Sequence, residues 1–282
     1  MNSSMITAAV SMNALQRKLE MLADNMANLN TVGYKRKSSV FEDVLTSINQ
    51  QNKDFVQPGR RTPLGITEGW GARLSSIMLD LSQGPLQETG VMTDVAIEGN
   101  GLFEVRTGGT IDSPPAFTKH GAFHLEPIPG EDGARMLVTS AGNPVVGQNG
   151  GTDSLIVVPN NYDLSIQPDG TLLAVGAQGS TPIELGKLKI TQPIKPELLQ
   201  AIGENLYGVP TGINVADVLA DVTYVPGETS GIAVRQGFLE NSNVSLTDEM
   251  ADLMIVQRAY QLSARALSSS DEMMGLANNL RG

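Results

Sequence analysis

The residues best suited to chemistry in this chain are a group of carboxylates in its middle part. Asp80, Asp94, Glu98 and Glu104 are candidates for the paired acids of a glycoside-cleaving enzyme, which act as general acid and as base or nucleophile. Such a pair must lie roughly 5–9.5 Å apart in space, and the order of residues along a chain does not fix that distance. Most acidic side chains are simply solvated. A secreted, β-rich carbohydrate-active enzyme is therefore kept as an alternative function, without assigned catalytic residues.

The two histidines of the chain are a second candidate site. His120 and His124 lie four residues apart on a predicted turn and strand, where alternation places them on one face. A metal ion could bind there, but the sequence indicates no third ligand. A Ser-His-Asp triad would need one of these histidines, and no Gly-x-Ser-x-Gly motif occurs. We therefore predict no catalytic residue, no metal site and no cofactor.

Loop sequences and composition argue against several other classes of function. Gly99-Asn100-Gly101 lacks the third glycine of a dinucleotide loop, and Gly186-Lys187-Leu188 lacks the upstream glycine and the Ser/Thr of a P-loop. The net charge of −11 disfavours binding to nucleic acid or to an anionic membrane surface. No apolar run of about eighteen residues is present to insert into a bilayer. The absence of cysteine excludes disulfides and thiolate metal sites.

The elements that would position functional residues begin with a helix predicted from about Ser4 to Leu29, which Gly33 ends. Its apolar residues recur at steps of three and four: Met5, Ala8, Met12, Leu15, Leu19, Leu22, Met26 and Leu29. This spacing places them on one narrow seam, of the kind that a coiled coil buries. Isolated helices are marginally stable in water, so the seam requires a packing partner.

A second helix is predicted from about Ser245 to Asn278, with Ser245 as its N-cap and Asp248 three residues later. Its seam consists of Leu246, Met250, Leu253, Gln257, Tyr260, Ala264, Leu267, Asp271 and Met274, of which Gln257 and Asp271 are polar interruptions. Gln257 can fix the register of a helix pair. Helices at the two termini can pair with each other or with other copies. The pattern therefore predicts an assembly domain formed by residues 1–33 together with 241–282.

Between the helices, short alternating runs separated by turn residues predict a β-rich core over residues 86–240. The predicted strands are Val91–Ile97, Leu102–Arg106, Ala122–Leu125, Met136–Thr139, Leu155–Val158, Leu164–Ile166, Leu172–Val175 and Leu188–Ile190. Residues 34–85 are predicted to form an arm and linker, with a short helix over Phe41–Ile48 and a turn-rich stretch over 49–71. The predicted fold is mixed α+β: a mainly β central domain, with long N- and C-terminal helices forming a coiled-coil domain.

Several stretches of the chain carry more specific information than these patterns. Near the N-terminus, an Asn-rich helix end is followed by Thr31-Val32-Gly33-Tyr34-Lys35. The central stretches are residues 83–90, 94–103, 117–123 and 203–207. Towards the C-terminus are residues 236–244, then Glu249-Met250 and Gln257-Arg258-Ala259-Tyr260. In content and order, nearly end to end, they resemble the signatures of the bacterial flagellar rod and hook proteins.

The resemblance implies a non-enzymatic structural subunit of the flagellar basal body. Such subunits polymerise helically through their terminal helices and form a hollow drive shaft and export channel. The length of the chain and the long segment 42–80 are most similar to a distal-rod protein. A hook or proximal-rod subunit of the same family is the alternative within this class. A secreted adhesin or fibre with helical ends would explain the composition but not the ordered signatures.

The resemblance also implies partners and a location. The partners are copies of the chain itself, other rod and hook subunits, and the flagellar type III export apparatus. The location is the basal body in the cell envelope. The N-terminus lacks the basic patch, apolar run and cleavage site of a Sec signal peptide, so we expect export without a cleavable signal.

Site residues follow from the seams and from the signatures together. On the N-terminal side, the assembly residues are the eight seam residues with Asn25, Asn28, Thr31, Gly33 and Tyr34. On the C-terminal side they are Leu246, Met250, Leu253, Gln257, Arg258, Tyr260, Ala264, Leu267 and Met274. The asparagines are expected to hydrogen-bond backbone where the first helix ends. Phe41 and Leu45 match the family's Phe-x-x-x-apolar motif for docking at the export gate.

Overall fold

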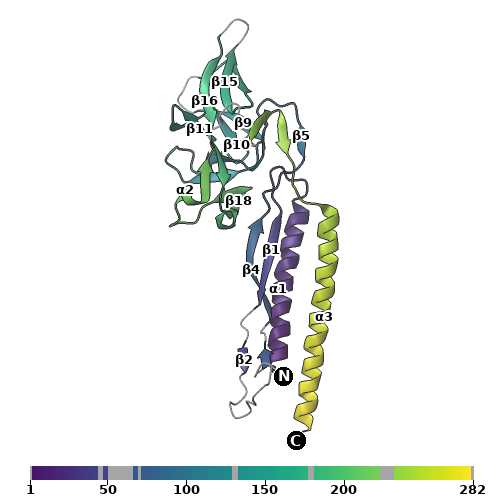
Figure 1. Cartoon of the computed structure of the whole chain (residues 1–282). Coiled ribbons are helices and arrows are strands. Elements are labelled where there is room, and N and C mark those ends of the chain that lie inside the picture. Colours follow the sequence, from purple (N-terminus) through teal and green to yellow (C-terminus); the bar gives the residue numbers. More distant parts are fainter. Residues whose placement is uncertain are drawn as a thin grey trace, which may run out of the picture. The chain divides into compact units, whose positions relative to one another are not determined.

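The computed structural model describes residues 2–43, 47–49, 66–68, 71–128, 133–176, 181–222 and 232–280. Its fold class is mixed α+β, with a mainly β central part between an N-terminal and a C-terminal helix (Figure 1). The chain forms two compact units. We call Met1–Ala27, Lys37–Met78 and Ser245–Gly282 the helical unit, and Asn28–Arg36 with Leu79–Val244 the β unit.

The helical unit is built on two long helices that lie side by side (Figure 1). Helix α1 spans Asn2–Ala27 and helix α3 spans Leu246–Asn279, which confirms both helices with ends within two residues of the predicted positions. Their contact contains a small apolar core in which Met21 and Leu22 of α1 pack against Val256 of α3. Most of the stability of a helix comes from such packing, so each helix depends on the other.

Short strands complete the helical unit. They are β1 (Lys37–Asp43), β2 (Ser47–Asn49), β3 (Ile66–Glu68) and β4 (Ala72–Leu79). Strand β1 pairs with β4, and β2 pairs antiparallel with β3. The helix predicted over Phe41–Ile48 is therefore wrong: Val40 and Phe41 lie in a strand. Branched and aromatic side chains suit a pleated strand, and the pairing with β4 outweighs a weak local preference for helix.

The β unit consists of short antiparallel strands. A six-stranded sheet has the order β18-β19-β8-β7-β17-β20, a five-stranded sheet the order β12-β11-β16-β15-β14, and a three-stranded sheet the order β13-β10-β9. The pairs β21-β6 and β22-β5 complete it.

The strands of the β unit have the following bounds: β5 Leu86–Glu88, β6 Val95–Glu98, β7 Leu102–Arg106, β8 Pro115–Thr118, β9 Phe123–Pro127, β10 Arg135–Thr139, β11 Val146–Asn149, β12 Thr152–Leu155, β13 Val157–Val158, β14 Tyr162–Ile166, β15 Thr171–Gly176, β16 Ile183–Leu188, β17 Ile190–Pro193, β18 Gln200–Gly203, β19 Leu206–Gly208, β20 Leu219–Asp221, β21 Ala233–Gln236 and β22 Phe238–Glu240. A 3-10 turn (η2, Pro196–Leu198) and a one-turn helix (α2, Val215–Val218) lie between strands of the six-stranded sheet.

Two apolar cores hold the sheets of the β unit together. The larger is centred on side chains such as Val95, Phe103 and Leu137, each with no exposed surface. Phe103 and Phe123 meet edge to face with ring centroids 5.1 Å apart, a favoured aromatic geometry. The smaller core surrounds Phe117 and Tyr207 on the six-stranded sheet.

Most of the predicted strands are present, and two of them are divided where the chain changes sheets. The predicted strand Leu155–Val158 is divided at Ile156, and Leu188–Ile190 is divided at Lys189. At both places the chain passes from one sheet to another within a single residue, so one apolar run serves two sheets. The predicted strand Val91–Ile97 begins only at Val95, since a turn formed by the Asp94 N–H and the Val91 carbonyl precedes it.

Two glycines of the signature stretches lie where no side chain fits. A Cβ atom on Gly121 would lie 1.7 Å from the Val95 carbonyl oxygen, and one on Gly84 would lie 2.1 Å from the Asn241 carbonyl oxygen. The backbone of Gly121 lies close to that of Val95 because the Gly121 carbonyl accepts a hydrogen bond from the Val95 N–H. Both glycines therefore permit a close backbone contact.

We predict that Gly121→Ala lowers the stability of the β unit by roughly 2–4 kcal/mol, because backbone must move to admit the methyl group. Gly90→Ala is the matched control: Gly90 has a φ of +70° but open space around its Cβ position. It should cost only about 1 kcal/mol, the price of a left-handed alanine. Urea unfolding followed by circular dichroism measures both, and equal losses would contradict the close contact at Gly121.

Candidate assembly site

The β unit buries a cluster of two lysines and one glutamate. The Lys35 ammonium donates to Glu240 Oε1 at 2.7 Å and to the Ser82 carbonyl at 2.6 Å. The second cation, Lys119, lies 3.4 Å from Glu240 Oε2. All three charged side chains are at most 2% exposed. We call Lys35, Lys119 and Glu240 the buried charge cluster.

Glu240 connects four stretches of the chain that are distant in sequence. Its backbone carbonyl accepts a hydrogen bond from the Gly33 N–H, and its Oε1 accepts one from the Gly84 N–H, both at 2.8 Å. Lys119 in turn donates to the carbonyls of Gly99 and Gly101. These groups come from four signature stretches: Gly33 with Lys35, Gly84, Gly99 with Gly101, and Lys119. The motifs that resemble the flagellar signatures thus meet at one carboxylate.

The cluster contains two cations for one anion, and burial makes that imbalance costly. Desolvation lowers the pKa of Lys119 to about 8, and the positive charge of Lys35 acts in the same direction. The Glu240 carboxylate opposes the shift. Removing one partner of a buried ion pair leaves an uncompensated charge, so such clusters are sensitive to substitution.

Asn243 fixes the two chain segments that flank this cluster. Its side-chain oxygen accepts a hydrogen bond from the Arg36 N–H at 2.8 Å, and its amide group donates to the Asp80 carbonyl at 2.9 Å and to Ser82. The Asp80 N–H in turn donates to the Arg36 carbonyl at 2.8 Å. The β unit therefore holds both the segment that follows α1 and the segment that precedes α3.

Within the helical unit, Asn25 has a comparable position. It has no exposed surface, and its amide group donates to the Lys37 carbonyl at 2.9 Å and to Glu249 Oε2 at 3.2 Å. Its side-chain oxygen accepts a hydrogen bond from the Lys37 N–H at 3.0 Å. One asparagine thus joins α1, β1 and α3. Asn25 thus makes backbone hydrogen bonds of the kind expected of it, and its part in assembly stays a prediction.

The predicted seam of α1 is only partly buried. Leu22 is buried, and Met5, Ala8, Met12, Leu15, Leu19 and Met26 are half-buried. Leu29 lies beyond the helix, in the part of the β unit that also contains Asn28, Thr31, Gly33 and Tyr34. There Thr31 Oγ1 donates to Asn28 Oδ1 at 3.1 Å, and Gly33 and Tyr34 are buried.

The predicted seam of α3 is divided between two faces. Leu253, Tyr260, Ala264, Leu267 and Met274 are half-buried, whereas Leu246, Met250, Gln257 and Asp271 are exposed. The predicted assembly residue Arg258, outside the seam, is exposed as well. The buried residues that the seam omitted are Glu249, Val256 and Ser270. They share the three-four spacing with Leu253 and Leu267. Two of them are polar, and a search for apolar periodicity passes over polar residues, although the spacing itself identifies them.

Phe41 lies on β1, half-buried, with the Lys18 ammonium 5.6 Å from its ring centroid. It lines a cavity of about 250 Å³ in the helical unit together with Ala72 and Ile255. Leu45, the other half of the predicted docking motif, lies outside the described residues.

Three families match successive parts of the chain. "Flagella basal body rod protein" matches residues 5–35, "Flagellar hook protein FlgE/F/G D1 domain" residues 96–174, and "Flagellar basal body rod FlgEFG protein C-terminal" residues 235–280. The "Flagellar basal-body rod protein FlgG" of Borreliella burgdorferi is 33% identical over 98% of this chain and 97% of its own. The chain belongs to the flagellar basal-body rod protein family.

Other relatives agree. The "Flagellar hook-basal body complex protein FlhP" of Bacillus subtilis is 30% identical over 99% of each chain, and the FlgG of the same organism is 32% identical over 99% of this chain and 98% of its own. This rod protein is accordingly a structural protein of the flagellum and not an enzyme, and it assembles with other axial subunits. None of the described helices is long and apolar enough to cross a membrane.

The carboxylates of this rod protein that were considered for catalysis make structural contacts. Glu104 pairs with Arg106 at 2.9 Å and with Lys189 at 3.1 Å; burial raises its pKa, and Lys189 opposes the shift. Glu98 pairs with Arg235 at 2.7 Å. These carboxylates hold strands together and are already neutralised by neighbouring cations.

The remaining candidates are similarly occupied. Asp80 caps its own turn by accepting from the Ser82 N–H, and Asp94 accepts a hydrogen bond from Thr89 Oγ1 at 2.7 Å. Burial lowers the pKa of His120, whereas His124 is exposed on β9. Among the described residues, no group of three His, Cys, Asp or Glu side chains is arranged to hold a metal ion.

We predict that Glu240→Gln destabilises the β unit of this rod protein by about 3–5 kcal/mol, because it leaves two buried ammonium groups without a counter-charge. Glu184→Gln, at an exposed position on β16, should change stability by no more than about 0.5 kcal/mol. Urea unfolding curves of the two variants and the parent chain test this. Equal stability of both variants would show that the cluster contributes nothing.

A pH dependence follows from Lys119. Its pKa is about 8 in the folded chain and near 10.5 in the unfolded chain, so the unfolded state binds more protons between these values. Stability should therefore rise with pH from about 8 to about 10.5, by roughly 3 kcal/mol, and this contribution should be constant below pH 8. Unfolding curves of the parent and of Lys119→Met isolate the effect, since their difference should slope across this range. A pH-independent difference would contradict the shift.

Proposed function

We propose that this rod protein is a subunit of the distal rod, which polymerises helically through its two terminal helices into the hollow drive shaft and export channel of the flagellum. The observation that carries the proposal is the pair α1–α3, in which one face of α3 packs against α1 while another exposes large apolar side chains. Exposed apolar surface of this kind is typical of a protein–protein interface. The name and near full-length match of the FlgG relatives support the rod as the assembly concerned.

In this proposal the chain has three functional parts. Residues 1–33 with 241–282 form the assembly domain, 34–85 the arm and linker, and 86–240 the β core. The seams of α1 and α3 form coiled-coil-like contacts with each other and with neighbouring copies, and Gln257 and Arg258, both exposed, contribute to contacts between copies. The segment from Asn28 to Tyr34 belongs to the β unit, where it contacts Glu240 and Asn205.

Export precedes assembly in the same proposal. The chain leaves the cell through the flagellar type III apparatus without a cleavable signal peptide, and Phe41 and Leu45 dock at the export gate. Phe41 is half-buried beneath Lys18 in the folded helical unit. Docking would therefore take place before this unit folds, while the ring is accessible.

The experiment that tests the proposal locates the tagged protein in purified basal bodies and compares it with a variant that lacks residues 2–27. This variant keeps residues 28–36, which belong to the β unit, so its β unit should fold with unchanged strand content. Because it lacks α1, it should be absent from the basal bodies and should not restore motility. Glu184→Gln serves as the control and should incorporate normally.

Two results would overturn the proposal. Incorporation of the truncated variant at the level of the control would show that α1 is not needed for assembly. A full-length protein found in the hook fraction, and not in the rod, would assign the chain to the hook alternative.

A further inference from the structure

Helix α3 has a row of exposed side chains on the face away from α1. Leu246, Met250, Met254, Arg258 and Leu262 follow one another at steps of four residues, which places them on one side of a helix. The exposed fractions of Met250, Met254 and Leu262 are 47%, 54% and 65%. We call Met250, Met254, Arg258, Leu262 and Arg265 the outer face of α3.

The outer face carries charge that the described part of the chain leaves unpaired. Arg258 and Arg265 are exposed, and neither forms an ion pair with any described residue. The outer face therefore combines exposed apolar side chains with two arginines that have no carboxylate partner among the described residues. A partner surface for it needs an apolar floor and an acidic group.

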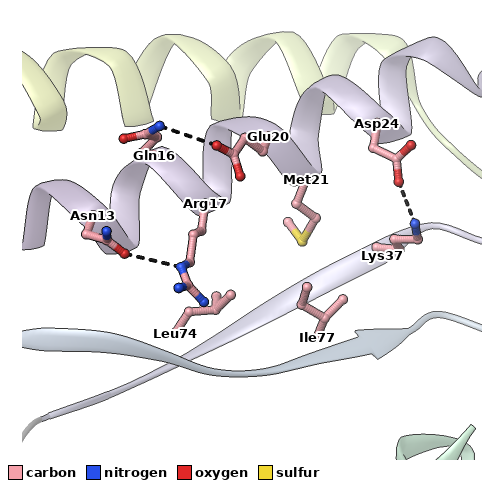
Figure 2. A pocket seen from close by; sticks show the side chains of 9 residues that line it. All are labelled: Asn13, Gln16, Arg17, Glu20, Met21, Asp24, Lys37, Leu74 and Ile77. Carbon is pink, nitrogen blue, oxygen red and sulfur yellow. Dashed lines mark hydrogen bonds and ion pairs between the residues drawn. The ribbon is translucent and has the colours of Figure 1, made fainter. Parts of the chain in front are cut away.

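A groove in the helical unit has both features. It lies between α1 and the strands β1 and β4, with a volume of about 660 Å³ (Figure 2). Figure 2 shows Arg17 and Met21 on α1 pointing towards the strands, and Leu74 and Ile77 of β4 lying opposite them. Ile77 is 52% exposed, which leaves apolar surface open to a partner. We call this the α1–β4 groove.

The acidic group of the groove is Glu20. It receives a hydrogen bond from Gln16 at 3.4 Å and forms no ion pair among the described residues. The nearby Asp24 is different, since Lys37 already neutralises it. Glu20 therefore offers the carboxylate that an arginine from outside can bind.

The groove is long enough for a helix. A second cavity of about 470 Å³ shares Asn13, Arg17 and Leu74 with it and extends it to Ala9. The groove thus follows α1 from Ala9 to Asp24, about 22 Å at ~1.5 Å per residue. The outer face of α3 from Met250 to Arg265 has the same length of about 22 Å by the same rise.

We propose that the outer face of α3 of one copy lies in the α1–β4 groove of the next copy, with its apolar side chains on Leu74 and Ile77 and its arginines at Glu20. The inference rests on the proposed function and names the surfaces that a second copy uses. Both halves of the contact belong to this chain, they match in length, and Glu20 is opposite in charge to Arg258 and Arg265. Arg17, which also lines the groove, donates to Asn13 Oδ1. Because the two surfaces differ, the contact is head-to-tail, and repeating it gives a ring or an open helical array and no symmetric dimer. The proposed rod corresponds to the open array.

Crosslinking tests the proposal directly, because the chain contains no cysteine and any introduced thiol is unique. Single variants Ile77→Cys and Leu262→Cys, mixed and treated with a short bismaleimide, should give a dimer with one copy of each. The double variant in basal bodies should give a ladder of higher species. Dimers of Leu262→Cys with itself, without mixed dimers, would overturn the proposal in favour of symmetric pairing of α3. If crosslinks formed only to a different protein, the groove would not be occupied by a second copy of this chain, and the proposal would be wrong.

A charge exchange tests the arginine contact. Glu20→Arg should lower the yield of mixed crosslinks about tenfold, and Arg258→Glu with Arg265→Glu should do the same. Combining the three changes should restore most of the yield, a rescue that general damage to the fold would not give. Failure of the combination to recover would exclude the contact at Glu20.

Substituting an apolar residue of the outer face distinguishes failure of the docking contact from failure of the proposed rod function. Leu262→Glu should reduce incorporation into basal bodies about tenfold, whereas Ile202→Glu, at a 62% exposed isoleucine on β18, should not. Circular dichroism should show unchanged helix content in both. If Leu262→Glu incorporates normally and no mixed crosslinks form, the docking is wrong while the rod function stands. If the parent protein is itself absent from basal bodies, the rod function fails instead.

Discussion

The structure depends above all on the burial of the Glu240 carboxylate between two lysine side chains. Isolated charges are costly to bury, and this carboxylate is stabilised by Lys35, by Lys119 and by the Gly84 N–H. Because each partner comes from a different part of the chain, the favourable energy is available only when all parts are in place. The buried charge cluster therefore specifies which segments meet, more than it adds net stability.

In the helical unit, the buried Asn25 connects separate segments as Glu240 does in the β unit. It is uncharged, so its burial costs less, but its amide satisfies both backbone groups of Lys37 and one oxygen of Glu249. An apolar residue there would leave these groups unsatisfied. The apolar contacts between α1 and α3 supply the driving force, and the asparagine selects one register for it.

The sequence predicted the elements well where apolar periodicity decides them, as in α1, α3 and strands such as Leu102–Arg106. It predicts the elements poorly where contacts with distant parts of the chain decide the structure. The sequence around Phe41 carries no strong strand signal, and its pairing with β4 is a long-range effect that the local pattern does not show. Glu249 and Ser270 were omitted from the packed face of α3 because apolarity was the criterion. The polar centre at Glu240 could not be found from spacing, since its partners lie in separate motifs.

The pairing of Lys35 with Glu240 also has a kinetic consequence. The two residues are separated by 205 positions, so their contact closes most of the chain into a loop. Contacts of such high sequence separation form late and slow the folding of β-rich domains, because the entropy of closing the loop is lost before the contact is gained. The β unit can therefore make this contact only when both ends of its sequence are available, so it completes its fold late.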